Sequence, residues 1–149
     1  MGAAFAVQQA VFDRLRTNAA LAALLADSVI AGSPTEPAVY DVPPQEQLSE
    51  DPSHFPYVVM GDDTAVEFDT DDVNGQETTT TLHIWSRYRG KKEVKQITDA
   101  IYNALHDATL TIAGQRAIYC FWEFSESVPE SDVLVQHGVI RFRIVTQEN

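Results

Sequence analysis

This chain of 149 residues has little cysteine, no long apolar run and, over almost half of its length, no positive charge. Its single cysteine, Cys120, excludes an intramolecular disulfide and fits a reducing compartment. No apolar run approaches the roughly 18 residues of a membrane-spanning helix. The apolar N-terminal stretch also lacks the basic leader of a signal peptide. We therefore expect a protein without a membrane partner.

The missing positive charge defines residues 17–86, which hold 13 acidic side chains and no lysine or arginine. The net charge of the whole chain is −12. Half of its basic residues lie in one short run, namely Arg87, Arg89, Lys91, Lys92 and Lys95. Tight binding to nucleic acid requires a basic face that releases counterions from phosphates. The composition therefore argues against specific nucleic-acid binding.

Motifs for catalysis and metal binding are also missing. The chain has no P-loop, no G-x-S-x-G sequence and no histidine or cysteine spacing typical of zinc. Asp62 and Asp63 are adjacent in an expected strand, so they point to opposite faces unless the strand bulges at Gly61. We expect His83 and His137 to be strand-surface or interface residues, although a zinc site could still assemble in three dimensions. No catalytic residue, metal or cofactor is assigned.

The hydrophobic pattern indicates one α+β domain, residues 1–149, in which helices pack on an antiparallel sheet of about four strands. Helices are expected at 4–15 and at 19–26, the second capped by Asn18, and the third, Lys91–His106, carries a single apolar stripe. Residues 30–55 are rich in proline, and only 38–42 look extended. Strands are expected at 56–68, 76–88, 116–124 and 133–146, with a turn at 125–132.

The first two strands form a long hairpin, since Asn74-Gly75 is a strong tight-turn signal. Its tip is acidic and contains Asp69, Asp71 and Asp72. The third strand has apolar residues on both faces, which predicts burial on both. Trp85 lies opposite the apolar face of its own strand, so both sides of the sheet need cover. Either the N-terminal helices or another subunit supplies it, and the separated charges suit head-to-tail association.

Four segments carry a resemblance to a known family. They are residues 55–63 (Phe-Pro-Tyr-Val-Val-Met-Gly-Asp-Asp), 81–87 (Thr-Leu-His-Ile-Trp-Ser-Arg), 101–106 (Ile-Tyr-Asn-Ala-Leu-His) and 137–143 (His-Gly-Val-Ile-Arg-Phe-Arg). Their order and spacing resemble the tail-completion, or tail-terminator, proteins of long-tailed bacteriophages, prophages and gene transfer agents. One departure is the segment 45–54, which is longer than the usual link that follows Val39-Tyr40-Asp41.

The resemblance implies a structural virion protein and not an enzyme. Family members form a homo-oligomeric ring, typically a hexamer, on the head-proximal end of the tail tube, in the neck region. The ring stops tube polymerisation, contacts the tail tube protein and the head-completion or connector protein, and lets DNA pass without specific binding. Assembly would take place in the cytoplasm of the bacterial host. The alternative is another neck component, such as a head-closure or adaptor protein, or a minor tail protein.

Two groups of residues are candidates for this role. The acidic tip, Asp69, Asp71 and Asp72, would line the lumen or contact the tube, and the competing placement is a solvated outer rim. The contacts between subunits or with the tube would use a second group: Trp85, Arg87, Arg89, Lys91, Lys92, Arg141 and Arg143. For Arg87, Arg89, Lys91 and Lys92 the alternative is a solvated helix start.

Overall fold

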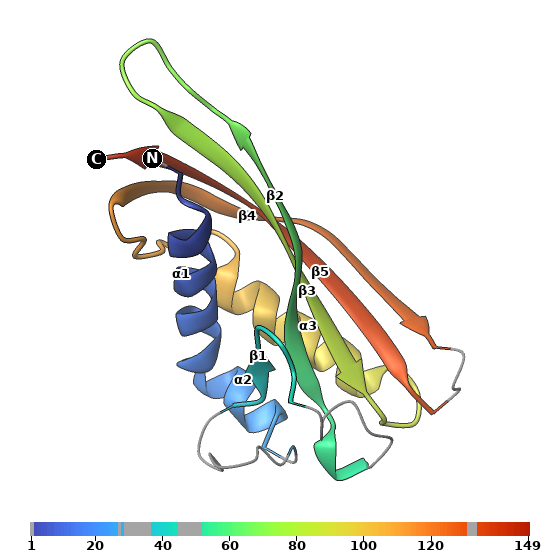
Figure 1. Ribbon diagram of the computed structural model, residues 1–149. Helices are drawn as coiled ribbons and strands as arrows, with labels where there is room; N and C mark the ends of the chain where they lie inside the picture. The colour runs from blue at the N-terminus through green and yellow to red at the C-terminus, as the bar shows by residue number, and fades with distance from the viewer. Residues whose placement is uncertain (1, 27, 29–36, 45–51, 131–133) are drawn as a thin grey trace.

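The structure is a computed structural model that describes the chain except for residues 1, 27, 29–36, 45–51 and 131–133. Two helices precede a hairpin, a third helix and a second strand pair (Figure 1), which confirms the predicted α+β class. The elements are α1 (Ala4–Arg16), α2 (Ala19–Leu24), β1 (Val39–Tyr40), η2 (Pro52–His54), β2 (Tyr57–Glu67), β3 (Gly75–Ser86), α3 (Lys92–Leu105), β4 (Gln115–Pro129) and β5 (Gln136–Glu148).

The strands form one mixed sheet of five in the order β1-β2-β3-β5-β4. Four of them are antiparallel as expected, and β2 and β3 form the predicted hairpin. The tight turn expected at Asn74-Gly75 is wrong, because residues 68–74 form the loop, Gly75 already belongs to β3 and neither residue has a positive φ. The fifth is the short β1, which lies within the expected extended segment 38–42 and runs parallel to β2 at the edge of the sheet. The predicted "about four" antiparallel strands therefore omitted this parallel addition.

A bulge interrupts β2 where the sequence allowed one. Met60 pairs with Leu82, and Asp63 pairs with Thr80, so β2 holds one extra residue between these pairs. Gly61 occupies the bulge, and a Cβ built there would lie 2.4 Å from Cδ2 of His83. Only glycine allows the two strands to approach this closely without a shift of the ring.

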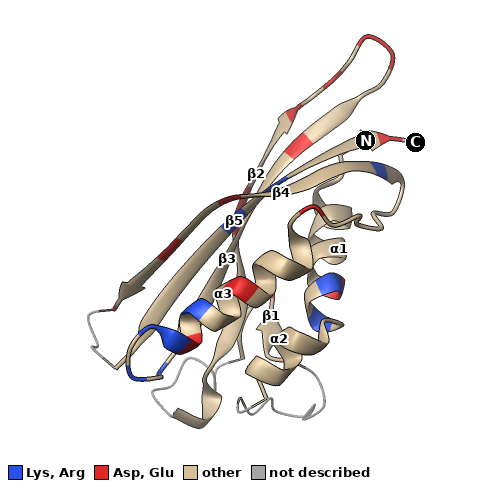
Figure 2. Ribbon diagram, turned by 180° about the vertical axis from the view of Figure 1, so that it is seen from behind, with Lys and Arg blue, Asp and Glu red and all other residues tan. Residues whose placement is uncertain are grey.

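The three α-helices lie on one side of the sheet. In Figure 1 the sheet lies in front of α3, and the reversed view of Figure 2 brings the helices forward. The predicted stripe of α3 is buried except at Tyr102, which is partly buried. Each fully buried side chain contributes about 1.5–3 kcal/mol when removed from water. The stripe packs with residues of β3, β5 and α1 in the main core: Val94, Ile97, Ile101, Leu105, Leu82, Ile84, Ile140, Phe142, Val7, Val11 and Leu15.

The N-terminal helices follow their local signals. Asn18 caps α2, as expected, because its side-chain oxygen accepts a hydrogen bond from the backbone N–H of Leu21 at 2.9 Å. Arg16, in the last turn of α1, donates to the backbone carbonyl of Val39 at 3.0 Å. This bond ties the helical layer to the edge strand β1.

Two predictions for the C-terminal half are wrong. The strand expected at 116–124 continues to Pro129, so most of the predicted turn at 125–132 is strand, and its last two residues lie outside the described part of the chain. Burial on both faces of this strand is also wrong, because β4 is the edge of the sheet. Its large apolar residues are exposed, with Trp122 at 43% and Phe121 at 39%.

Candidate assembly surfaces

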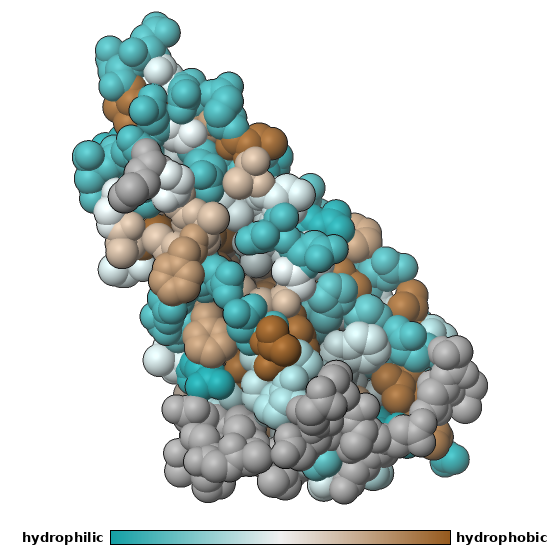
Figure 3. All heavy atoms as spheres, in the orientation of Figure 1, coloured by the Kyte–Doolittle hydropathy of each residue, from teal (hydrophilic) through white to brown (hydrophobic). Residues whose placement is uncertain are grey.

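One face of the sheet is covered by no described helix, and we call it the open face. It presents alternate residues of β3 and β5, which are Thr81, His83 and Trp85 from β3 and His137, Val139, Arg141 and Arg143 from β5. Figure 3 shows this side of the molecule, with hydrophobic side chains lying between polar ones. The N-terminal helices therefore do not cover Trp85, which answers one alternative left open by the sequence.

Trp85 is held in place by stacking. Its ring lies 4.0 Å from that of His137, with an angle of 6° between the planes. A small cluster formed by Ala38, Tyr40, Phe55 and Tyr57 packs beside it, so Trp85 is half-buried. Stacked aromatic pairs of this kind are worth about 0.5–1.5 kcal/mol beyond the area that they bury. The tryptophan is thus presented in a fixed orientation.

The two histidines of the open face come together although 54 residues separate them in the sequence. Nδ1 of His83 lies 2.7 Å from Nε2 of His137, and Nδ1 of His137 lies 2.8 Å from Oε1 of Glu130. Burial, followed by the charge of His137, lowers the pKa of His83 below its ordinary value, while Asp62 acts in the opposite direction. Sequence spacing could not reveal this pairing, because only the β3–β5 register creates it.

Arg141 and Arg143 lie on the open face. Arg141 donates from Nε to the hydroxyl of Thr81 at 3.3 Å, and its guanidinium lies 5.2 Å from the centre of the Phe124 ring. Arg143 pairs with Thr79 across the strands and is exposed. Together they give the open face positive charge in an otherwise acidic chain.

The edge strand β4 carries a group of residues that the sequence did not identify as a surface. We call it the aromatic edge, and it consists of the exposed residues Ile118, Phe121, Trp122 and Phe124. His106 at the end of α3 accepts a hydrogen bond at Nδ1 from the backbone N–H of Trp122 at 3.0 Å. That bond satisfies a backbone donor where the register of β4 against β5 shifts, between Trp122 and Phe124. The signal for the aromatic edge in the sequence was the presence of apolar residues on both faces of this strand, which we interpreted as burial.

The hairpin extends beyond the helical layer as an acidic arm, residues 62–75 (Figure 1). All six of its acidic residues are exposed: Asp62, Asp63, Glu67, Asp69, Asp71 and Asp72. Asp69 has a structural role, because its Oδ1 accepts a hydrogen bond from the backbone N–H of Gly75 at 2.8 Å. Val66 and Phe68 are also exposed, at 58% and 44%. The arm therefore offers acidic and apolar groups together.

The basic turn, residues 87–92, runs from the end of β3 to the first residue of α3 and contains Arg87, Arg89, Lys91 and Lys92. Figure 2 shows these positive charges at the end of the molecule opposite the acidic arm. The structure therefore separates the two predicted groups of charge along the length of the protein. It does not bring the acidic tip and the basic residues together within one copy.

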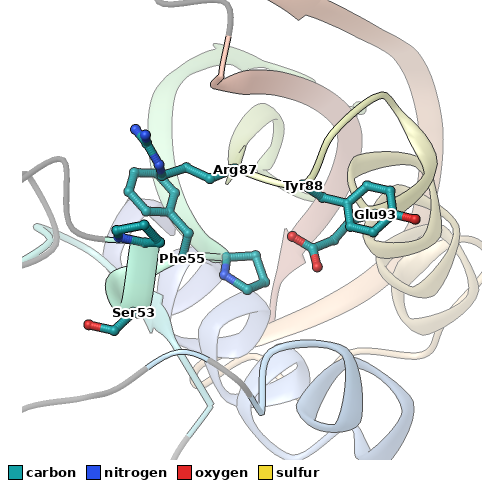
Figure 4. Close-up of a pocket in the computed structure, with 7 residues that line it drawn as sticks. Ser53, Phe55, Arg87, Tyr88 and Glu93 are labelled. Atoms are coloured by element: carbon teal, nitrogen blue, oxygen red, sulfur yellow. The ribbon is translucent and has the colours of Figure 1, made fainter.

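A shallow depression of about 390 Å³ lies beside the basic turn, and the residues that line it include Ser53, Phe55, Arg87, Tyr88 and Glu93 (Figure 4). The Arg87 guanidinium lies 5.6 Å from the centre of the Phe55 ring. Glu93 is engaged, because it accepts a hydrogen bond from the Ser86 hydroxyl at 2.7 Å. This lining provides apolar and basic contact area.

Little in the described part of the chain suggests catalysis or metal binding. The Cys120 thiol is buried, and burial raises its pKa to about 12, so it packs as a small apolar group. Among the described residues there is no group of three histidine, cysteine or acidic side chains able to hold a metal ion. No described helix is both long enough and apolar enough to cross a membrane.

The chain is similar to proteins of virion tails. The sequence model of the family described as Tail completion protein gp17 matches residues 9–147. Tail completion protein gp17 of Bacillus phage SPP1 is 26% identical over 106 residues, which are 69% of this chain and 78% of that protein. A chain in the solved structure of the virion of a native gene transfer agent particle superposes with a TM-score of 0.79 at 23% identity. That superposition covers 98% of both chains and shows a shared fold.

Proposed function

We propose that copies of this chain form a ring. The premise is that the chain belongs to the tail completion protein gp17 family and is a structural protein in the neck region of a virion tail. The ring, of six copies in our proposal, sits on the head-proximal end of the tail tube. It stops tube growth and provides the surface to which the head is joined, and DNA passes through its lumen. The observation that carries the proposal is the open face, which no described helix covers and on which stacking fixes Trp85.

The separation of charge supports head-to-tail contacts between copies. An acidic arm at one end and a basic turn at the other are self-complementary only between different molecules (Figure 2). Such a heterologous contact closes into a ring or grows into a filament, depending on the rotation between neighbours. Together with Trp85, Arg141 and Arg143, the basic turn supplies the subunit or tube contact in our proposal.

Net charge supports a lumen that DNA can traverse. Each copy has a formal charge of −12, so six copies carry 6 × −12, or −72. Phosphates are repelled by acidic surfaces, and adhesion to the wall would slow DNA ejection. We place Asp69, Asp71 and Asp72 at the lumen or against the tail tube for this reason.

The acidic tip is tested by changing Asp69, Asp71 and Asp72 together to asparagine. Asparagine retains an oxygen that can accept the Gly75 hydrogen bond, so the substitution removes charge while keeping the turn. We expect altered tail length or reduced infectivity. Replacing Asp99 and Asp107, which are exposed at and just after α3, by asparagine removes charge elsewhere and serves as the control. Normal tails and normal infectivity in the triple variant would favour the solvated rim.

The basic turn is tested by the double charge reversal Arg87→Glu and Arg89→Glu. We expect weaker ring assembly that is more sensitive to salt, because exposed charge pairs are screened within about 10 Å at 0.1 M ionic strength. The matched control is Lys95→Glu with Arg116→Glu, which reverses two exposed charges outside the turn. Sedimentation that is unchanged in the turn variant would refute its place in the contact.

A further inference from the structure

The open face holds a continuous chain of hydrogen bonds from Glu130 through His137 to His83. Three segments contribute to it, since Glu130 follows β4, His137 lies in β5 and His83 in β3. The two contacts are short, at 2.8 Å and 2.7 Å. The middle member, His137, also stacks on Trp85. Whatever breaks the chain therefore frees the ring against which Trp85 is fixed.

The chemistry of the three groups determines where the hydrogens lie when both histidines are neutral. An ionised carboxylate only accepts hydrogen bonds, so Nδ1 of His137 must carry the hydrogen that it donates to Glu130. Nε2 of a neutral His137 is then an acceptor. Consequently Nδ1 of His83 must carry a hydrogen as well, and Nε2 of His83 is left without one.

One added proton leaves the chain intact. If it binds His83 at Nε2, the bridging hydrogen can move to His137, whose positive charge then lies beside Glu130. His137 now donates from Nε2, and His83 accepts at Nδ1 as a neutral ring. In either arrangement a single hydrogen lies between the two rings, so both hydrogen bonds persist.

A second proton breaks it. With both rings charged, each nitrogen of the 2.7 Å contact carries a hydrogen, and two donors with like charge face each other. The surrounding charges do not prevent this break. Asp62 on β2 attracts a charged His83, Glu126 faces the same side from β4 and Arg141 adds positive charge from β5. None of them can accept the surplus hydrogen at the centre of the contact.

We propose that Glu130, His137 and His83 form a latch for the Trp85 surface. The chain of hydrogen bonds holds this surface when no proton or one proton has been added, and the second added proton breaks the chain. This inference rests on the proposed function in one respect, since the latched face is the surface through which copies associate. Association between copies is then lost at the pH at which the second proton binds. The latch itself is a property of each copy and can be measured without any ring.

The direct test is nitrogen-15 NMR of the histidine rings in the full-length protein. At pH 8 we expect His83 and His137 both to carry their hydrogen on Nδ1. His106 is an internal control with the opposite form, because its Nδ1 accepts from the Trp122 N–H and its hydrogen must be on Nε2. On the first protonation His83 should switch to the Nε2–H form, and the Trp85 indole signal should change only at the second step. An Nε2–H form of His83 or His137 at pH 8 would overturn the proposal.

A pair of variants tests the role of the carboxylate. Glu130→Gln removes the charge beside His137, so the first protonation step of the pair should move about one pH unit lower. Glu126→Gln makes the same chemical change on the same face and should move that step far less. Equal shifts in the two variants would overturn the latch. Copies that do not associate at any pH would instead contradict the proposed ring and leave the NMR result standing.

Discussion

The contact between α3 and β5 gives the sharpest quantitative prediction, because it depends on one missing methyl group. Gly138 lies in β5 beneath α3, and a Cβ built there would be 2.6 Å from Cγ2 of Val94 and 3.3 Å from Cβ of Ile84. Val94 and Ile84 are both fully buried. Gly138→Ala must therefore push apart a packed layer that has no free space.

The expected cost follows from two opposing terms. Forcing an extra methyl group into a well-packed core costs about 1–3 kcal/mol. Alanine restricts the unfolded chain more than glycine does, which returns about 0.4–1 kcal/mol. The free energy of unfolding should fall by about 1–2 kcal/mol, which lowers the melting temperature by roughly 2–4 °C per kcal/mol in a domain of this size.

A double-mutant cycle isolates the contact. Val94→Ala alone removes two buried methyl groups and should cost about 1–3 kcal/mol. In the double variant the new methyl group occupies part of the vacated space, so the combined cost should be about 1 kcal/mol less than the sum. Rescue is incomplete because Ile84 still crowds the position.

The assay is urea denaturation followed by circular dichroism, with the slope of the transition unchanged among the variants. Gly114→Ala is the control, since Gly114 has φ +73° and a Cβ built there would meet nothing within 4 Å. Its cost comes from the backbone conformation and should simply add to that of Val94→Ala. If the cost of Gly138→Ala also adds to that of Val94→Ala, within about 0.3–0.5 kcal/mol, the close packing of α3 on β5 at Gly138 is refuted.

Three further predictions concern a cap, a thiol and pH. Asn18→Ala should lower the free energy of unfolding by about 1 kcal/mol, whereas Asn103→Ala on the exposed side of α3 should leave it almost unchanged in the same urea assay. Cys120 should not react with iodoacetamide at pH 8 until the protein unfolds, because its pKa is about 12; rapid labelling of native protein would contradict this. Folding lowers the pKa of His83, so the unfolded chain binds more protons than the folded protein below pH 6.5. The free energy of unfolding should therefore fall as the pH drops from 7 to 5. It should depend less on pH in His83→Gln.

The parts of the fold that the sequence predicted are those with a local cause. The spacing of Val94, Ile97 and Ile101 defines one buried face of α3, and the structure buries that face. Asn18 likewise marked the start of α2. Each of these signals acts within a few residues, so no knowledge of the tertiary arrangement is needed to interpret it.

The failures have a common origin in strand order. Apolar residues on both faces of a strand indicate burial if the strand is central, but β4 lies at the edge of the sheet, where the same pattern leaves Trp122 and Phe121 exposed. The β1 addition and the His83–His137 contact likewise depend on which strands are neighbours. Pro129 lies in the segment where we expected a turn, yet proline is tolerated at the end of an edge strand.

The candidate site divides in the same way. Alternation along β3 correctly predicted that Trp85 lies opposite the apolar face of its strand, and the β3–β5 register places Arg141 and Arg143 on the same side. Composition identified the acidic and basic segments, but only the fold shows that they lie at opposite ends of the molecule (Figure 2). Whether these surfaces contact a neighbouring copy or the tail tube stays a prediction.

Electron microscopy of particles assembled without this chain tests the central claim most directly. If the protein ends tube growth and supplies the joining surface, tails made in its absence should be overlong or should lack heads, and adding back the purified protein should restore joining. Tails of normal length, joined to filled heads without the protein, would contradict the account.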